Sequence, residues 1–262
     1  MGNAEEFWVC HLGHVPYSDG VALQGTLRER RLSRELPDLM LLLEHPPTYT
    51  RGRRSGSEDL PFGESFYRAK GIEVHDTDRG GKLTYHGPGQ LVGYPIVAID
   101  DVDRYLRTME QAIIDALAVQ GVQARSRAHE GIDYTGVWVQ DRKIASIGVH
   151  VSRGVTTHGF AVNVENDLEP FSWVTACGLP DVQMTSLAAE LPRSNPQHAD
   201  YDSAARGSGL ACFRKEVAYR FCQAFGRRQR LVSPRRLGIG ETRSYREAPT
   251  GAELIRSEVV AV

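Results

Sequence analysis

The chain has 262 residues, of which 41% are hydrophobic and 24% charged, and its formal net charge at pH 7 is −2. Composition therefore excludes a disordered or collagen-like protein, and a charge near zero argues against a dedicated nucleic-acid-binding protein, whose domain is usually basic. The sequence holds no apolar run long enough to span a membrane, and its acidic beginning is unlike a secretory signal peptide. We expect a cytoplasmic globular protein.

The first third of the chain predicts strands around one long helix. The helix is expected over residues 17–36, where Pro37 ends it. Residues 46–63 are dense in Pro, Gly and Arg and predict a surface loop. Strands are predicted at residues 7–12, 38–45 and 72–76, the second of them a continuous apolar run typical of a buried strand.

The rest of the chain mixes helices with strands in hairpins, which does not fit a purely parallel sheet. Helices are predicted at residues 103–120, 186–191 and 204–225, and strands at 91–98, 134–140, 143–151 and 156–164. The expected fold class is α/β of the α+β type: a single domain over residues 1–226, with a mixed or antiparallel sheet flanked by helices. Residues 227–262 predict a tail of uncertain order.

Residues 79–90, RGGKLTYHGPGQ, form a glycine-rich loop that matches neither phosphate-binding glycine motif. Glycines let the backbone approach a ligand closely, and Thr84, Tyr85 and His86 could orient one there. A surface turn is the alternative, but a twelve-residue loop with these side chains at its centre favours a binding role.

Arginine is far more frequent than lysine in this chain. Only four of the 31 basic residues are Lys: Lys70, Lys82, Lys143 and Lys215. Arg does not give up its proton in proteins, whereas Lys can act as a base or pair with a thiolate. Lys143, which opens a predicted strand, and Lys82, inside the glycine-rich loop, are therefore candidate functional residues.

The four cysteines have no spacing typical of a zinc site, and without an export signal they predict reduced thiols. Cys10, Cys212 and Cys222 fit small buried apolar residues. Cys177 lies in a Gly-Leu-Pro loop, where a reactive thiolate could form beside a basic neighbour. That neighbour could be Lys143, or one of His86 and His158, and the spacing alone does not choose between them.

Five segments together resemble the octanoyltransferases of lipoate synthesis, also called lipoate-protein ligase B. They are LEHPPTYTRGRR (43–54), RGGKLTYHGPGQLVGYPI (79–96), KIASIGVHV (143–151), TTHGFAVNV (156–164) and ACGLPDVQMTSL (176–187). The resemblance runs from about Phe7 to Phe225. Two small departures, Arg51 and Leu83, do not touch the cysteine or the lysine.

The resemblance implies the catalytic-domain fold shared with biotin and lipoate protein ligases. It implies transfer of an octanoyl or lipoyl group from acyl carrier protein to a lysine of lipoyl domains, in 2-oxo-acid dehydrogenase E2 subunits and the glycine cleavage H protein. Neither a metal nor another cofactor is implied, and the protein is expected to be a monomer.

The resemblance also assigns roles to residues. Cys177 carries the acyl group as a thioester, Lys143 serves as acid and base, and His158 is a possible supporting residue. The residues implied to bind the acyl substrate are Arg79, Gly80, Gly81, Lys82, Leu83, Thr84, Tyr85, His86, Ser146, Ile147, Gly148, Gly159, Phe160 and Ala161.

Two other functions stay open. An ATP-dependent lipoate or biotin protein ligase would share the fold but needs no thiol nucleophile, so Cys177 argues against it. A non-catalytic module that binds a carrier protein would use Arg51, Arg53 and Arg54 to meet an acidic partner.

Overall fold

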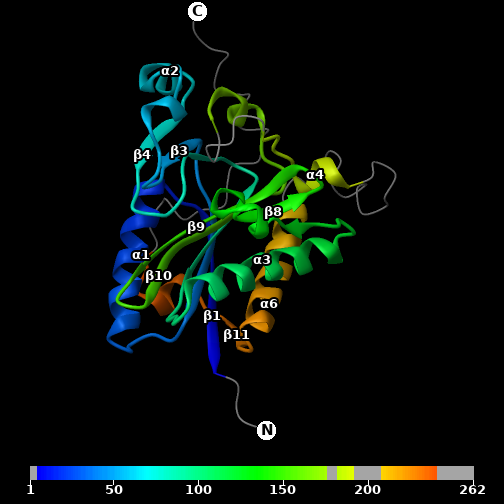
Figure 1. Ribbon diagram of the computed structural model, residues 1–262. Coiled ribbons are helices and arrows are strands. Elements are labelled where there is room, and N and C mark those ends of the chain that lie inside the picture. The colour runs from blue at the N-terminus through cyan, green and yellow to red at the C-terminus, as the bar shows by residue number, and fades with distance from the viewer. Residues whose placement is uncertain (1–4, 176–181, 192–207, 241–262) are drawn as a thin grey trace, which may run out of the picture.

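The computed structural model describes residues 5–175, 182–191 and 208–240. Its centre is an eight-stranded sheet in the order β11-β1-β2-β6-β10-β9-β8-β7, with α1 on one side and α3 and α6 on the other (Figure 1). β1 pairs in parallel with both β2 and β11, and all other neighbours in this sheet are antiparallel. The expected mixed sheet flanked by helices is confirmed.

The strands of the main sheet are β1 (Glu6–His14), β2 (Leu39–Glu44), β6 (Gln90–Ile96), β7 (Arg125–Ser126), β8 (Gly136–Val139), β9 (Arg142–Ser152), β10 (Val155–Asn163) and β11 (Arg228–Leu231). The α-helices are α1 (Tyr17–Leu32), α2 (Glu64–Ala69), α3 (Val102–Val119), α4 (Leu187–Glu190) and α6 (Ser208–Ala224).

The apolar run of β2 is explained by cores on both faces of the sheet. Met40 and Leu42 pack into the core beneath α3 and α6, whereas Leu39 and Leu41 pack into the core on the α1 side. Successive side chains of a strand point to opposite faces, so a strand covered on both faces has to be apolar at every position.

A second sheet of three short strands, β4-β3-β5, lies beside the main one, next to α2 (Figure 1). Its strands are β3 (Thr48–Arg51), β4 (Glu73–Asp76) and β5 (Thr84–His86). Tyr49, Tyr67 and Tyr85 form its core together with Phe171. This sheet brings the glycine-rich segment against the main sheet.

The second sheet corrects two predicted loops. β5 lies inside residues 79–90, β3 lies inside residues 46–63, and α2 begins directly after that segment, at Glu64. Strands of three or four residues carry little periodicity of their own, and these form because β3 pairs with both β4 and β5.

Two further boundaries differ from expectation. α1 ends at Leu32, four residues earlier than predicted, and Arg34 adopts a φ of 61° before the chain turns into β2. The tail begins with β11, which extends the main sheet beside β1. Within the described part of the chain, no helix is long and apolar enough to cross a membrane.

Candidate functional site

A cavity of about 610 Å³, including its part open to solvent, lies between the second sheet and strands β9 and β10 of the main sheet. It is lined by Tyr17, Arg54, Arg79, Gly81, Lys82, Leu83, Thr84, His86, Tyr94, Ile132, Asp133, Thr135, Lys143, Ser146, Ile147, Gly148, His158, Gly159, Phe160 and Ala161. Segments that are far apart in the sequence therefore meet at one site.

The glycine-rich segment forms one wall of the cavity and is held by buried Arg79. The guanidinium of Arg79 donates to the carbonyl oxygen of Thr50 at 2.6 Å, to its Oγ1 at 2.8 Å and to the carbonyl oxygen of Gly80 at 3.0 Å. Two predicted binding residues of this segment do not line the cavity. Gly80 bonds through its backbone to Val149, and Tyr85 packs away from the cavity against the ring of Phe171.

The facing wall comes from two neighbouring strands in register. Gly148, Ile147 and Ser146 of β9 pair with Gly159, Phe160 and Ala161 of β10, and all six line the cavity. Gly148 leaves room for the glycine-rich segment, because a Cβ there would lie 2.9 Å from the carbonyl oxygen of Gly80. The absence of a side chain at Gly148 thus lets the two walls come close together.

Lys143 reaches this cavity because of a bulge in β9. Val137 pairs with Ala145, but the next residue of β8, Trp138, pairs with Lys143, so Ile144 is an extra residue. A bulge re-aims the side chains beside it, and here Ile144 joins Ala145 in the core beneath α3. Lys143 is only 2% exposed and lines the cavity instead.

Cys177 lies outside the described residues, but the chain on both sides of residues 176–181 is described. Before this segment, the amide of Thr175 donates to the carbonyl oxygen of Asp59 at 3.2 Å. After it, the amide of Lys143 donates to the carbonyl oxygen of Gln183 at 2.8 Å. The amide of Thr185 donates to the carbonyl oxygen of Lys143 at 3.0 Å. The segment that follows Cys177 is therefore bonded to the backbone of Lys143.

The three cysteines among the described residues, Cys10, Cys212 and Cys222, do not line the cavity. Cys10 and Cys222 are buried as expected, and burial raises the pKa of each thiol to about 12. The expectation that Cys212 is buried was wrong: it is exposed, because its position on α6 faces away from the sheet-side core that holds Phe213.

His158 also lines the cavity and is held by a carboxylate. Its Nε2 lies 2.7 Å from Oδ1 of Asp78, and this hydrogen bond lowers the pKa of Asp78 to about 2. His158 has a φ of 58°, in the left-handed region that residues with a Cβ adopt infrequently. Its amide is held by Oε1 of Gln24 at 2.6 Å.

His86 is joined to the Lys143 region by buried amides. Nδ1 of His86 donates to Oε1 of Gln90 at 2.8 Å, Nε2 of Gln90 donates to Oδ1 of Asn163, and Nδ2 of Asn163 donates to the carbonyl oxygen of Thr185. Thr185 in turn bonds to the backbone of Lys143. This chain of contacts ties the two walls of the cavity together.

Several lining residues were not among the predicted site residues, and most of them come from segments outside the five motifs. Tyr17 and Tyr94 stand on α1 and β6, and Ile132, Asp133 and Thr135 come from the segment between β7 and β8. Arg54 lines the cavity and pairs with Asp133 at 2.7 Å.

Arg51, expected to meet a partner, pairs within the chain with Asp76 and Glu64. Among the described residues, no group of three His, Cys, Asp or Glu could hold a metal ion.

Two buried histidines, His45 and the cavity-lining His86, predict loss of stability in acid. Nδ1 of His45 donates to the carbonyl oxygen of Val15, and the hydroxyl of Tyr94 donates to Nε2 of the same ring, each at 2.6 Å. Burial lowers the pKa of His45 to about 4 and that of His86 well below 6.5. The unfolded chain therefore binds more protons than the folded one as the pH falls from 6.5 towards 4. We expect His45 alone to cost about 3 kcal/mol of stability across this range.

Denaturant unfolding of the unmodified protein and of His45→Gln between pH 7 and pH 4.5 measures this effect. The variant is expected to be less stable at pH 7 and less dependent on pH. His129→Gln is the control, because the side chain of His129 is 75% exposed. An equal pH dependence of stability in His45→Gln and the unmodified protein would contradict the prediction.

Comparison with known proteins agrees with this geometry. Residues 16–205 match the model of the lipoyl protein ligase A/B catalytic domain. An octanoyltransferase of Rubrobacter xylanophilus is 47% identical over 188 residues, which cover 70% of this chain and 83% of the relative. An octanoyltransferase of Acidobacterium capsulatum is 43% identical over 198 residues, which cover 69% of this chain and 79% of the relative.

A solved structure shares the fold. The bipartite lipoate protein ligase of Thermoplasma acidophilum superimposes with a TM-score of 0.64, at 16% identity, over 87% of this chain and 87% of that one. At such low identity the likeness concerns the fold alone, whereas the two relatives above are similar along most of their sequence. The chain therefore belongs to the lipoyl protein ligase A/B catalytic-domain family and, within it, to the octanoyltransferases, which makes it an acyltransferase.

Proposed function

We propose that this enzyme transfers an octanoyl or lipoyl group from acyl carrier protein to a lysine of lipoyl domains, through a thioester on Cys177. The proposed acceptors are the lipoyl domains of 2-oxo-acid dehydrogenase E2 subunits and the glycine cleavage H protein. Two curated relatives with the name octanoyltransferase, each more than 40% identical, support the reaction class.

In the first step, Sγ of Cys177 attacks the carbonyl carbon of the acyl thioester. A new carbon–sulfur bond forms, the bond to the carrier's sulfur breaks, and the carrier leaves as a thiolate that takes up a proton. One thioester replaces another, so no ATP is consumed. A thiol with an ordinary pKa of about 8.5 is mostly protonated at pH 7, so Cys177 needs a basic neighbour, and Lys143 is the proposed one.

In the second step, the lysine amine of the lipoyl domain attacks the Cys177 thioester. An amide bond forms, the bond to Sγ of Cys177 breaks, and the attacking nitrogen loses a proton. A lysine amine has an ordinary pKa of about 10.4 and is mostly charged at pH 7, so a base has to accept its proton. The amine of Lys143 is proposed to accept this proton and to return one to the departing sulfur.

The cavity beside Lys143 suits an acyl chain. Leu83, Ile147, Phe160 and Ala161 supply apolar surface, and Gly81, Gly148 and Gly159 line the cavity without adding a side chain. Apolar lining with a few polar groups is typical of a small-molecule site. We assign the acyl chain to this cavity, with its carbonyl group towards Lys143.

The placement of Lys143 is the observation that carries the proposal. It is a buried amine on the cavity wall, and its backbone bonds to the residues that follow the Cys177 segment. A solvated surface lysine would be neither buried nor on a cavity wall. Lys143, to which the proposal assigns acid–base chemistry, therefore contacts both the cavity and the chain that follows the Cys177 segment.

Acyl transfer measured with two different donors tests the proposal. We expect the protein to octanoylate a lipoyl domain when supplied with octanoyl-acyl carrier protein and no ATP, and to be inactive with free octanoate plus ATP. Activity with octanoate and ATP alone would indicate an ATP-dependent ligase. Binding of the acylated carrier without any transfer would indicate a non-catalytic module.

A further inference from the structure

The amine of Lys143 lies against the indole of Trp138, which none of the five motifs contains. Trp138 is fully buried and is the cross-strand partner of Lys143 at the bulge, and Nζ of Lys143 lies 5.2 Å from the ring centre. An ammonium group within about 6 Å of an indole is attracted by the electron-rich face of the ring. Trp138 therefore supplies both a wall and an attraction for this amine.

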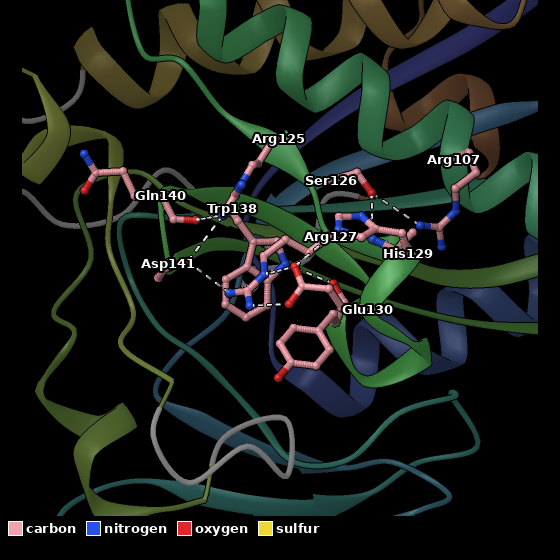
Figure 2. A network of polar contacts seen from close by, with 11 residues as sticks. Arg107, Arg125, Ser126, Arg127, His129, Glu130, Trp138, Gln140 and Asp141 are labelled. Atoms are coloured by element: carbon pink, nitrogen blue, oxygen red, sulfur yellow. Dashed lines mark hydrogen bonds and ion pairs between the residues drawn. The ribbon is translucent and has the colours of Figure 1, made fainter.

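The indole itself is held in place from several sides. Its Nε1 donates to the carbonyl oxygen of Tyr134 at 2.9 Å. The guanidinium of Arg127 lies 4.6 Å from the ring centre of Trp138 and 4.6 Å from that of Tyr134. Figure 2 shows Arg127 against Trp138, with Glu130 and Asp141 bonded to the guanidinium. Two carboxylates and two aromatic rings thus fix the cation that backs the indole.

Gly136, which lies on β8 with Trp138, makes room for the aliphatic part of the Lys143 side chain. A Cβ at Gly136 would lie 2.7 Å from Cε of Lys143 and 2.4 Å from the carbonyl oxygen of Ala145. The amide of Gly136 donates at 2.9 Å to Oε1 of Glu110, which is 1% exposed. Oε2 of Glu110 accepts from Ser126 at 2.6 Å and from Arg107 at 2.7 Å. The floor under Lys143 is therefore fixed by a fully bonded buried carboxylate.

We infer that Trp138, backed by Arg127, is a positioning residue that holds the amine of Lys143 in its reactive place. The inference rests on the proposed function of Lys143. A lysine side chain has four rotatable bonds and much conformational freedom to lose, and a misplacement of about 1 Å can cost about 100-fold in rate. The indole of Trp138 packs on one side of the Lys143 side chain, and Gly136 packs against its Cε. Together they restrict this side chain to conformations that place its amine in the cavity.

Kinetics of octanoyl transfer by Trp138→Leu and Trp138→Phe test this inference. We expect Trp138→Leu to lower kcat about tenfold or more, with the KM for the lipoyl domain changed by no more than about twofold, because the amine is displaced while the acceptor surface stays. Trp138→Phe keeps an aromatic face and is expected to stay within about threefold of the unmodified enzyme. A purely structural role would not predict this separation of kcat from KM or the rescue by phenylalanine.

Trp8→Leu is the matched control. Trp8 also has cations over its ring, with Arg230 at 5.8 Å and Arg236 at 5.2 Å, but it does not line the cavity. Circular dichroism checks folding, and if Trp138→Leu does not fold, Trp138→Met replaces it, since methionine fills irregular space without a ring. A folded Trp138→Leu or Trp138→Met with the kcat of Trp8→Leu would overturn the inference.

The double variant Trp138→Leu/Lys143→Arg separates this inference from the proposed function. If the indole acts through Lys143, the double variant is no slower than Lys143→Arg alone. An inactive Lys143→Arg beside a normal Trp138→Leu overturns the inference and leaves the proposed function standing. A fully active Lys143→Arg overturns the role proposed for Lys143 and this inference with it, whereas an unmodified chain without transfer activity overturns the proposed function as a whole.

Discussion

Cys177→Ala is expected to abolish octanoyl transfer, with a loss of about 1000-fold or more, because the covalent route has no other nucleophile. Intact mass measured after incubation with octanoyl-acyl carrier protein gives the most direct result. The unmodified protein is expected to gain one octanoyl group, and the variant none. The adduct should be lost on treatment with hydroxylamine, which cleaves thioesters.

Cys212→Ala is the control for this experiment, since Cys212 is the exposed cysteine among those described. A reactive surface thiol could take up an acyl group without any role in catalysis, and this variant reveals such labelling. It is expected to form the adduct and transfer it at the normal rate. Normal acylation of a lipoyl domain by Cys177→Ala would contradict the proposed mechanism.

Lys143→Arg is expected to fold and to lower transfer by about 100- to 10,000-fold, the range of general acid–base catalysis. Arginine keeps the positive charge but does not give up a proton at any pH where proteins fold. Lys143→Met, which has a similar length and no charge, is expected to lose activity as well. Rapid mixing separates the steps: acyl-enzyme formation reports on the activation of Cys177, and its decay with a lipoyl domain reports on proton removal from the acceptor.

Lys70→Arg provides the matched control for the lysine substitution. Lys70 lies at the end of α2, its Nζ is 5.5 Å from the ring of Trp173, and it does not line the cavity. Its replacement by arginine is expected to leave transfer unchanged. Near-normal activity of Lys143→Arg would remove Lys143 from the mechanism and shift the assignment of a base to His86 or His158, both of which line the cavity.

Patterns that repeat along the chain identified most of the long elements. α3 occupies Val102–Val119 against a prediction of residues 103–120, because Asp101 caps it and its apolar residues recur at helical spacing. β2 was recognisable because both of its faces are buried. β3 and β5 were missed, since a strand of three or four residues is stabilised by partners that only the tertiary structure supplies.

By itself, the sequence determined which residue types were available for the proposed chemistry: one loop cysteine, one lysine at a strand start, and glycine-rich segments in an order typical of one family. It did not determine on which face of the sheet Lys143 lies. Lys143 and Ser146 are three residues apart, and in a regular strand they would point to opposite faces. Only the tertiary structure decided this, because the bulge at Ile144 turns Lys143 onto the face of Ser146 and the cavity, beside Trp138.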